Sequence, residues 1–229
     1  MSFQRARNEE QRAERRQAIL TTAQAMLADM PVAELSLNEL ARRVGLAKSN
    51  VLRYFGSREA VLLELLGDAC REWRAELERL PATDGDARER CDALATALAS
   101  SVEARPVLCD LLAAQASVLE RNVSAEVAAR FKRAALAEVS ALAEVVRHRI
   151  PELTAEDAVK FVGAAMMSAG AVWSHTCPST AMLAAYEADP ALAALRLPLR
   201  ETLEELFAVL LAGLLDRAAN PAGQRANTQ

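Results

Sequence analysis

Apolar residues recur along this chain at the three- and four-residue spacing of helices with one buried face. In residues 9–29 this spacing places Ile19, Ala23, Met26 and Leu27 on a common side. No segment shows the apolar-polar alternation of a strand. Alanine and leucine dominate, and Gly and Pro number only 8 each, a composition that favours helix. The sequence therefore predicts an all-α fold.

Start and stop signals divide the pattern into about nine to ten helices. Ser36 followed by Glu39 is typical of a capping box, and Gly45 suits the left-handed residue after a helix end. The predicted helices cover residues 9–29, 37–44, 48–54, 58–80 behind a Ser57 cap, 86–101, 106–120, 124–149, 154–175 and 198–219, with one or two short helices between 177 and 198. The polar tail from residue 220 is expected to fray.

Charge is divided unevenly along the chain. The formal net charge is −4, yet residues 1–58 carry ten Lys and Arg against six Asp and Glu, whereas the remainder carries seventeen against twenty-five. A basic N-terminal part attached to an acidic body is compatible with a nucleic-acid partner for the first part, which the net charge alone would argue against. We place the domains at 1–56 and 57–229.

The cysteines and the apolar runs predict a cytoplasmic protein that does not enter the membrane. Cys70, Cys91, Cys109 and Cys177 are far apart, which favours reduced thiols over a disulfide framework. The longest apolar run, residues 161–173, is shorter than the roughly 20 residues that a membrane span needs. The charged N-terminus has no apolar core of a signal peptide.

Residues 36–54 have the pattern of a helix-turn-helix, with a tight turn at Gly45 and apolar residues that hold the two helices together. The second helix is expected to bury Val51 and to expose Lys48 and Asn50. Asn50 can pair with adenine and Lys48 with guanine in the major groove. Arg53, Tyr54 and Arg58 stand where phosphate contacts would fix the register, and the amides near Ser36 can hold a further phosphate.

The segment "SLNELARRVGLAKSNVLRYFGSREAVL" resembles the DNA-binding signature of the TetR/AcrR family of bacterial transcriptional regulators, over about residues 9–66. It departs from the common pattern at Ala47, which lacks a capping hydroxyl, and at Leu52, which replaces a frequent Tyr. The resemblance implies a three-helix N-terminal DNA-binding domain and a helical ligand-binding and dimerisation domain. It assigns base-side roles to Asn38, Lys48, Ser49 and Asn50, and backbone roles to Ser36, Arg53, Tyr54 and Arg58.

The same resemblance assigns the dimer interface to helices 154–175 and 198–219, which pair into a four-helix bundle in the family. The last helix is apolar around more than one face, which indicates two partners. The expected interface residues are Gly163, Met167, Gly170, Leu203, Phe207, Leu210 and Leu214. The alternative is that both helices simply pack in their own core.

Family members hold a small apolar effector in the second domain, so the resemblance also implies a ligand cavity. The candidate lining residues are Trp73, Cys109, Gln115, Phe131, Met166, Met167, Trp173, His175 and Tyr186. Each of them can equally be ordinary core, because Met and aromatic residues fill any helical core. His175 and Cys177 lack the ligand pairs of a structural zinc site, and no catalytic or phosphate-loop motif occurs, so we expect no metal, no cofactor and no enzyme.

These observations predict a ligand-responsive homodimeric repressor that binds a palindromic operator in double-stranded DNA. Two-fold dimers of this kind read half-sites roughly 34–36 Å apart. Two alternatives stay open: an architectural DNA-binding protein without an effector, and an α-helical enzyme or lipid-binding protein in which the helical hairpin is only structural. The sequence leaves activation as an alternative to repression.

Overall fold

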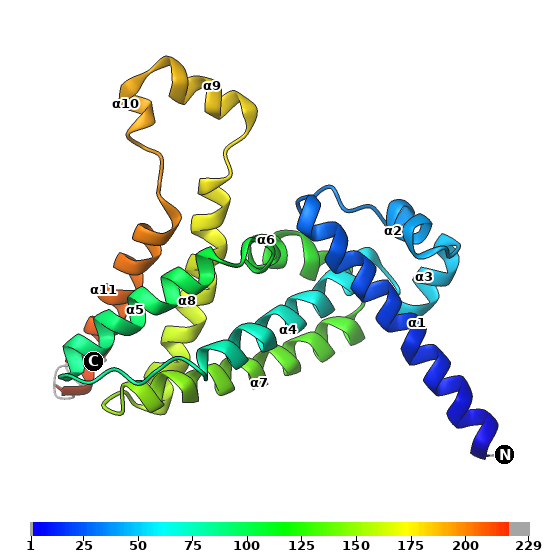
Figure 1. Cartoon of the computed structure of the whole chain (residues 1–229), viewed down its shortest axis with the longest axis horizontal. Coiled ribbons are helices and arrows are strands. Elements are labelled where there is room, and N and C mark those ends of the chain that lie inside the picture. Colours follow the sequence, from blue (N-terminus) through cyan, green and yellow to red (C-terminus); the bar gives the residue numbers. More distant parts are fainter. Residues whose placement is uncertain (1, 220–229) are drawn as a thin grey trace, which may run out of the picture.

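The computed structural model describes residues 2–219, and every secondary-structure element in that range is helical (Figure 1). The elements are α1 (Ser2–Asp29), α2 (Leu37–Val44), α3 (Lys48–Phe55), α4 (Arg58–Leu77), α5 (Ala87–Glu103), α6 (Pro106–Ala114), η1 (Gln115–Leu119), η2 (Glu120–Asn122), α7 (Ala125–Arg149), α8 (Ala155–Thr176), α9 (Thr180–Ala188), α10 (Pro190–Ala193) and α11 (Leu199–Ala219). This confirms the all-α prediction. The tail from residue 220 lies outside the described residues.

The helix ends follow the signals read from the sequence. Gly45 adopts a φ of 72°, and its N–H bonds back to carbonyls of α2. The Ser57 hydroxyl accepts the Ala60 N–H at 3.1 Å and starts α4, while Thr154 caps α8 in the same way. Pro106 occupies the first turn of α6, where no N–H is needed. These boundaries are confirmed to within a few residues.

Two predicted features differ in detail. The helix predicted over 106–120 ends as an α-helix at Ala114 and widens into the π-turn η1, across which the Gln115 side-chain amide donates to the Glu120 carboxylate at 2.7 Å. The Ser36 capping box is half formed. Ser36 Oγ accepts the Glu39 N–H at 3.2 Å, but the Glu39 carboxylate accepts from arginines of its own helix instead of the Ser36 N–H.

The helices form a small N-terminal unit and a larger body. Helices α1, α2 and α3 lie together at one end, and α4 leads from them into the body, where it lies beside α7 (Figure 1). On the opposite side α11 packs on α5, and α8 packs on α6, α7 and α11. One continuous core of buried apolar residues joins the unit to the body. None of the described helices is long and apolar enough to cross a bilayer.

Helices α8 and α6 approach each other closely at Gly170 of α8. A Cβ atom at this position would lie 2.9 Å from backbone atoms of Leu112 and Ala113 in α6. Such a contact is shorter than packed atoms allow, so only glycine fits there without moving one of the helices. The sequence assigned Gly170 to the dimer interface. The structure instead buries it inside the protomer, against the backbone of α6.

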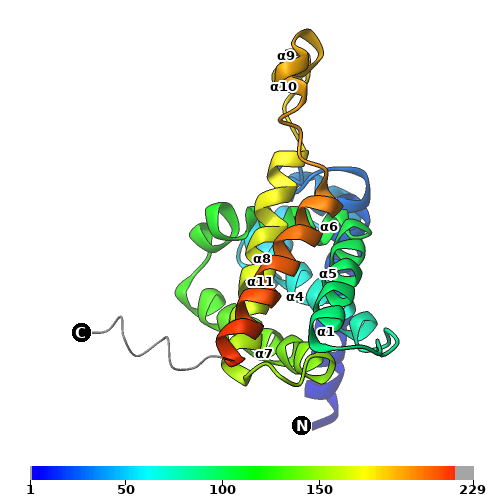
Figure 2. The same ribbon diagram turned by 90° about the vertical axis from the view of Figure 1, so that its left-hand side faces the viewer.

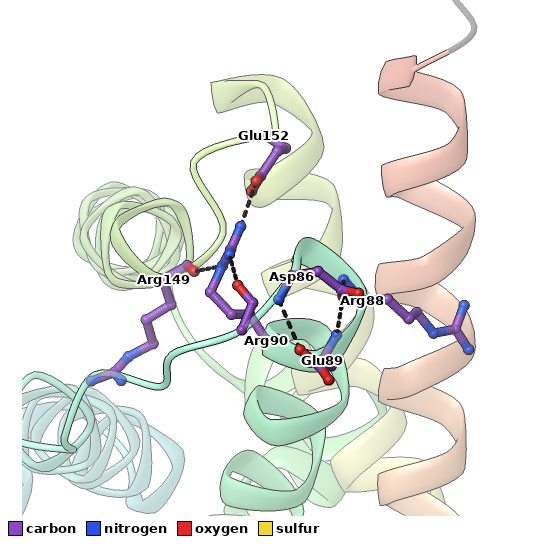
Figure 3. A network of polar contacts seen from close by, with 7 residues as sticks. Asp86, Arg88, Glu89, Arg90, Arg149 and Glu152 are labelled. Atoms are coloured by element: carbon purple, nitrogen blue, oxygen red, sulfur yellow. Dashed lines mark hydrogen bonds and ion pairs between the residues drawn. The ribbon is translucent and has the colours of Figure 1, made fainter.

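The loop "PATDGD", residues 81–86, is held by a polar network (Figure 3). Asp86 and Glu89 form a complete capping box at the start of α5. Arg90 bonds the carbonyls of Gly85 and Arg149, at 2.5 and 3.1 Å, and pairs with Glu152. The Arg149 guanidinium in turn donates to backbone carbonyls at the end of α4. The network therefore ties the ends of α4 and α7 to the start of α5.

Residues 177–198, which include α9 and α10, form a helical hairpin that we call the arm. The arm joins α8 to α11 and projects away from the rest of the protein in both views (Figures 1 and 2). None of its residues is buried. The arm thus adds nothing to the core of its own chain.

Candidate nucleic-acid interface

Helices α2 and α3 form the helix-turn-helix predicted from the sequence. Leu40 and Ala41 of α2 are buried together with Val51 and Phe55 of α3, so one face of each helix belongs to the core. The left-handed Gly45 makes the sharp turn between them, and the next amide, that of Leu46, bonds to the Ala41 carbonyl at 2.9 Å. The turn and the shared core fix α3 relative to α2.

The outer face of α3 presents the polar residues that the sequence singled out. Lys48, Ser49 and Arg53 are exposed and Asn50 is half-buried, while Leu52 lies between the two faces. Ala47 occupies the N-cap position of α3 and forms no side-chain capping bond, because its methyl group cannot accept a hydrogen bond. Ser36 and Asn38 at the start of α2 are also exposed. The candidate base-reading residues therefore share an accessible surface.

Only some of the cations of this motif are free of partners. Glu39 accepts hydrogen bonds from Arg42 and Arg43, and these bonds lower the pKa of its carboxyl group to about 2. In the part of the chain that the structure describes, Lys48 and Arg53 form no ion pair. Positive charge that is not neutralised internally is what a phosphate backbone attracts. Lys48 and Arg53 thus present positive charge on α3 that no ion pair among the described residues neutralises.

Arg16 of α1 connects the end of α3 to α4. Its guanidinium donates to the Tyr54 carbonyl at 2.8 Å, lies 4.1 Å from the centre of the Phe55 ring and pairs with Glu64. Burial lowers the pKa of Arg16, and the positive charges of Arg130 and Arg12 lower it further. The residue was not identified from the sequence, because its partners in α3 and α4 lie 38 to 48 residues further along the chain.

Arg58, which the sequence predicts to contact phosphate, forms a hydrogen bond inside the protein. Its Nη2 donates to the Val32 carbonyl at 2.6 Å, and its Nε is buried. The Val32 N–H donates to the Asp110 carboxylate, also at 2.6 Å. A single residue of the α1–α2 turn is therefore held by α4 on one side and by α6 on the other.

Replacing Arg58 with alanine is expected to destabilise the fold by about 1–3 kcal/mol, because the Val32 carbonyl loses its donor. Arg53→Ala is the matched control. It should change the unfolding free energy by no more than about 0.5 kcal/mol, yet weaken binding evenly across DNA sequences. Urea unfolding and DNA titration of both variants separate the two roles. Equal stability with weaker DNA binding for Arg58→Ala would restore its phosphate role.

The body contains a cavity of about 1130 Å³ between α1, α4, η1, α7 and α8. Its walls are mostly apolar, with Leu63 and Leu66 from α4, Phe131 and Val139 from α7, and Met166 from α8. The volume is slightly larger than the roughly 300–1,000 Å³ that is usual for a pocket that binds a small organic molecule. The π-turn η1 contributes Gln115 to the wall.

The structure brings together four of the nine residues predicted to bind a ligand: Gln115, Phe131, Met166 and Met167 all line this cavity. The other five lie elsewhere. The Trp73 indole is buried and donates to Ser101 Oγ at 2.9 Å, and the Cys109 thiol is buried against the Val102 carbonyl. Trp173 packs on the core outside the cavity lining, His175 is exposed near the end of α8, and Tyr186 belongs to the arm. These five residues are therefore not part of the lining of this cavity.

The residues predicted for the dimer interface also divide into two groups. Leu203, Phe207 and Leu214 are at most 7% exposed and belong to the core of the protomer, as does Gly170. Leu210 and Gly163 are half-buried, and Met167 is 72% exposed. The apolar residues of α11 that do face outward are Leu206 and Val209.

Sequence reasoning identified Phe131 of α7 but missed the other residues that α4 and α7 contribute to the cavity. Apolar residues of α7 that face it, Val127, Phe131 and Ala135, recur at four-residue spacing, and the helix buries few large side chains before Leu142. A helix whose apolar stripe contains small residues leaves space beside it. This spacing is the signal that could have identified the wall, although it does not reveal which helix lies opposite.

The fold and the α2–α3 motif define a helix-turn-helix regulator with a helical second domain. A family model described as "Bacterial regulatory proteins, tetR family" matches residues 19–65. A second, described as "Tetracyclin repressor-like, C-terminal domain", matches residues 68–218. The chain therefore belongs to the TetR family of transcriptional regulators, and its N-terminal part is a helix-turn-helix DNA-binding domain.

Similar proteins agree with this family. The HTH-type transcriptional regulator EthR of Mycobacterium tuberculosis is 37% identical over 73 residues, which cover 32% of this chain and 34% of that protein. The chain thus matches about a third of the length of this curated relative. A TetR transcriptional regulator from Rhodococcus sp. RHA1 shares the fold at 12% identity, with a TM-score of 0.58 over 92% of this chain and 98% of that one. The fatty acid degradation regulator FadR from Bacillus halodurans has a TM-score of 0.51 at 16% identity, over 86% of this chain and 98% of that one.

Proposed function

We propose that this protein is an effector-responsive homodimeric repressor that binds a palindromic operator through α3 of each copy. The observation that carries the proposal is the outer face of α3, where Lys48, Ser49 and Arg53 are exposed and the two cations form no ion pair with any residue that the structure describes. A helix with this surface, held by a buried opposite face, suits the major groove. Asn50 reads adenine, Lys48 reads guanine, and Arg53 contacts phosphate.

The proposed roles of Asn38 and Ser49 at the bases, and of Ser36 and Tyr54 at the backbone, are supported by their places beside this surface. Ser36, Asn38 and Ser49 are exposed, whereas Tyr54 is half-buried. The palindrome follows from two-fold symmetry, because a dimer presents the same helix to two half-sites in opposite orientation.

The effector of this proposal is a small apolar molecule that enters the cavity of the body. Glu64 lines the cavity and pairs with Arg16, which holds the Tyr54 carbonyl at the end of α3. A ligand that shifts α4 therefore changes the support of the recognition helix. Binding then favours a form of the dimer with a different spacing of its two recognition helices, and operator affinity falls.

Selection of bound fragments from a pool of random duplex DNA, followed by sequencing, tests the operator. The expected result is a palindromic consensus whose binding weakens steeply with salt. In Asn50→Ala, discrimination at one base position of each half-site should fall by about 1–3 kcal/mol, while binding to random DNA is retained. Equal losses on operator and random DNA would exclude base reading by Asn50, and binding without any sequence preference would exclude the operator proposal.

A further inference from the structure

Exposed large apolar side chains are concentrated in one continuous segment of the chain. Among the described residues, 11 such side chains are exposed, and nine of them lie between residues 155 and 219. They are Val159 and Met167 on α8, Met182, Leu183, Leu192, Leu195 and Leu197 in the arm, and Leu206 and Val209 on α11. Soluble monomers rarely leave a contiguous apolar surface of this kind uncovered.

The arm is too apolar and too short to be stable as a free hairpin. Its 22 residues include three charged ones, Glu187, Asp189 and Arg196, whereas a quarter of the whole chain is charged. Asp189 is used to cap α10. Helix α9 has only 9 residues, and isolated helices shorter than about 12–15 residues are marginal in water. Order in the arm therefore requires a surface outside its own chain.

The apolar surface continues from the arm onto the body. On α8, Val159, Gly163 and Met167 follow one another at four-residue spacing, and the last two also line the cavity of the body. Leu206, Val209 and Gly213 lie along α11 at three- and four-residue spacing. Helices α8 and α11 pack side by side (Figure 2). No atom lies within 4 Å of a Cβ built on Gly163 or Gly213, so the protomer itself does not require glycine at either position. Small residues there leave room for the close approach of another helix.

We propose that the arm clasps a second copy of this chain, with α9 and α10 of each protomer packed against the outward face of α8 and α11 of the other. This rests on the homodimer of the proposed function. A stable interface takes roughly 20–30 residues from each side. Helices α8 and α11 together expose 17 residues, which is fewer than this, and the 22 residues of the arm supply the remainder.

A second copy suits the arm because a two-fold dimer would cover both the arm and the outward face of α8 and α11 in each protomer. Each protomer has one apolar arm and one apolar face, and an isologous pair covers both arms and both faces. A lipid surface fits less well, since the arm has one basic residue, Arg196, and anionic membranes are bound by several.

The test is the dimer dissociation constant, measured by sedimentation over a dilution series. The arm variant is Leu192→Ser with Leu195→Ser, and the matched control is Leu136→Ser on α7, since Leu136 and Leu195 are 66% and 64% exposed. Two-fold symmetry removes four buried leucines in the arm variant, so its dissociation constant should rise at least about 100-fold. The control should dimerise as the wild type does.

Hydrogen exchange of residues 180–197 provides a second readout that does not depend on a substitution in the arm. Their amides should be protected in the wild-type dimer and unprotected in Val209→Arg, a variant that disrupts the α11 face and leaves α4 and α5 folded. A dimer of wild-type affinity in the arm variant, or equal protection of the arm in dimer and monomer, would overturn the clasp and leave the homodimer standing. A wild-type protein that is monomeric throughout would overturn both.

Discussion

Replacing Phe207 with alanine is expected to lower the free energy of unfolding by about 3–5 kcal/mol. The Phe207 ring is 1% exposed and packs edge-on against Phe161, with 6.1 Å between ring centres. Helix α11 is packed against both α5 and α8, so the surrounding helices cannot close the space that the ring leaves. Denaturant unfolding followed by circular dichroism measures the loss.

Leu136→Ala is the control for this variant. It removes a similar apolar side chain that is 66% exposed, and it should change the unfolding free energy by no more than about 0.5 kcal/mol. A small loss for Phe207→Ala would contradict its place in the core and would return the residue to the dimer interface predicted from the sequence.

Arg16→Ala is expected to lower the unfolding free energy by about 2–3 kcal/mol and to weaken operator binding. The loss combines a charged hydrogen bond to the Tyr54 carbonyl, the contact with the Phe55 ring and the ion pair with Glu64. Operator binding weakens because all three contacts support the end of α3 or the helix beside it. Unfolding and DNA titration of the same sample give both values.

Two further variants show whether the geometry of the guanidinium matters. Arg15→Ala removes a neighbouring, exposed arginine and should leave stability unchanged. Arg16→Lys keeps the charge but loses the planar fork that reaches Tyr54 and Glu64 together, so it should recover only part of the loss. Full recovery by lysine would mean that charge alone acts at this position.

The helix-turn-helix could be predicted closely because its signals are local. Ser36, Gly45 and Ser57 each act on a backbone group within a few residues, so their effect is visible in a short window of sequence. The spacing of Val51 and Phe55 then shows which face of α3 is buried. Helix boundaries and the exposed residues of the motif follow from these positions alone.

The buried face of α11 could not be predicted in the same way. Leucine and phenylalanine occur around much of this helix, so periodicity does not distinguish the side that meets α5 and α8 from the side that faces outward. Phe207 and Val209 differ by two positions and lie on opposite sides. Only the packing of the protomer separates core from surface here.

The roles of residues whose partners lie far along the chain could not be predicted from the sequence, for a different reason. Arg53 and Arg58 are both basic residues close to α3, yet Arg58 is bound to the carbonyl of Val32 and Arg53 is exposed. Nothing within a few residues of either one distinguishes them. The cavity could not be predicted for the same reason. It is lined by side chains of both α4 and α7, and neither helix alone shows that the other lies opposite.

The bonds that hold Val32 have a consequence for protein engineering. The Asp110 carboxylate accepts a hydrogen bond from the N–H of this residue, and the Arg58 guanidinium donates one to its carbonyl. Both groups of Val32 belong to the peptide backbone. These two hydrogen bonds therefore do not depend on the side chain at position 32, which is itself buried, and they exclude only proline, which has no N–H to donate. A chimera that grafts the first helix and turn of another regulator onto this body would keep the joint intact, provided that the body brings its own aspartate and arginine.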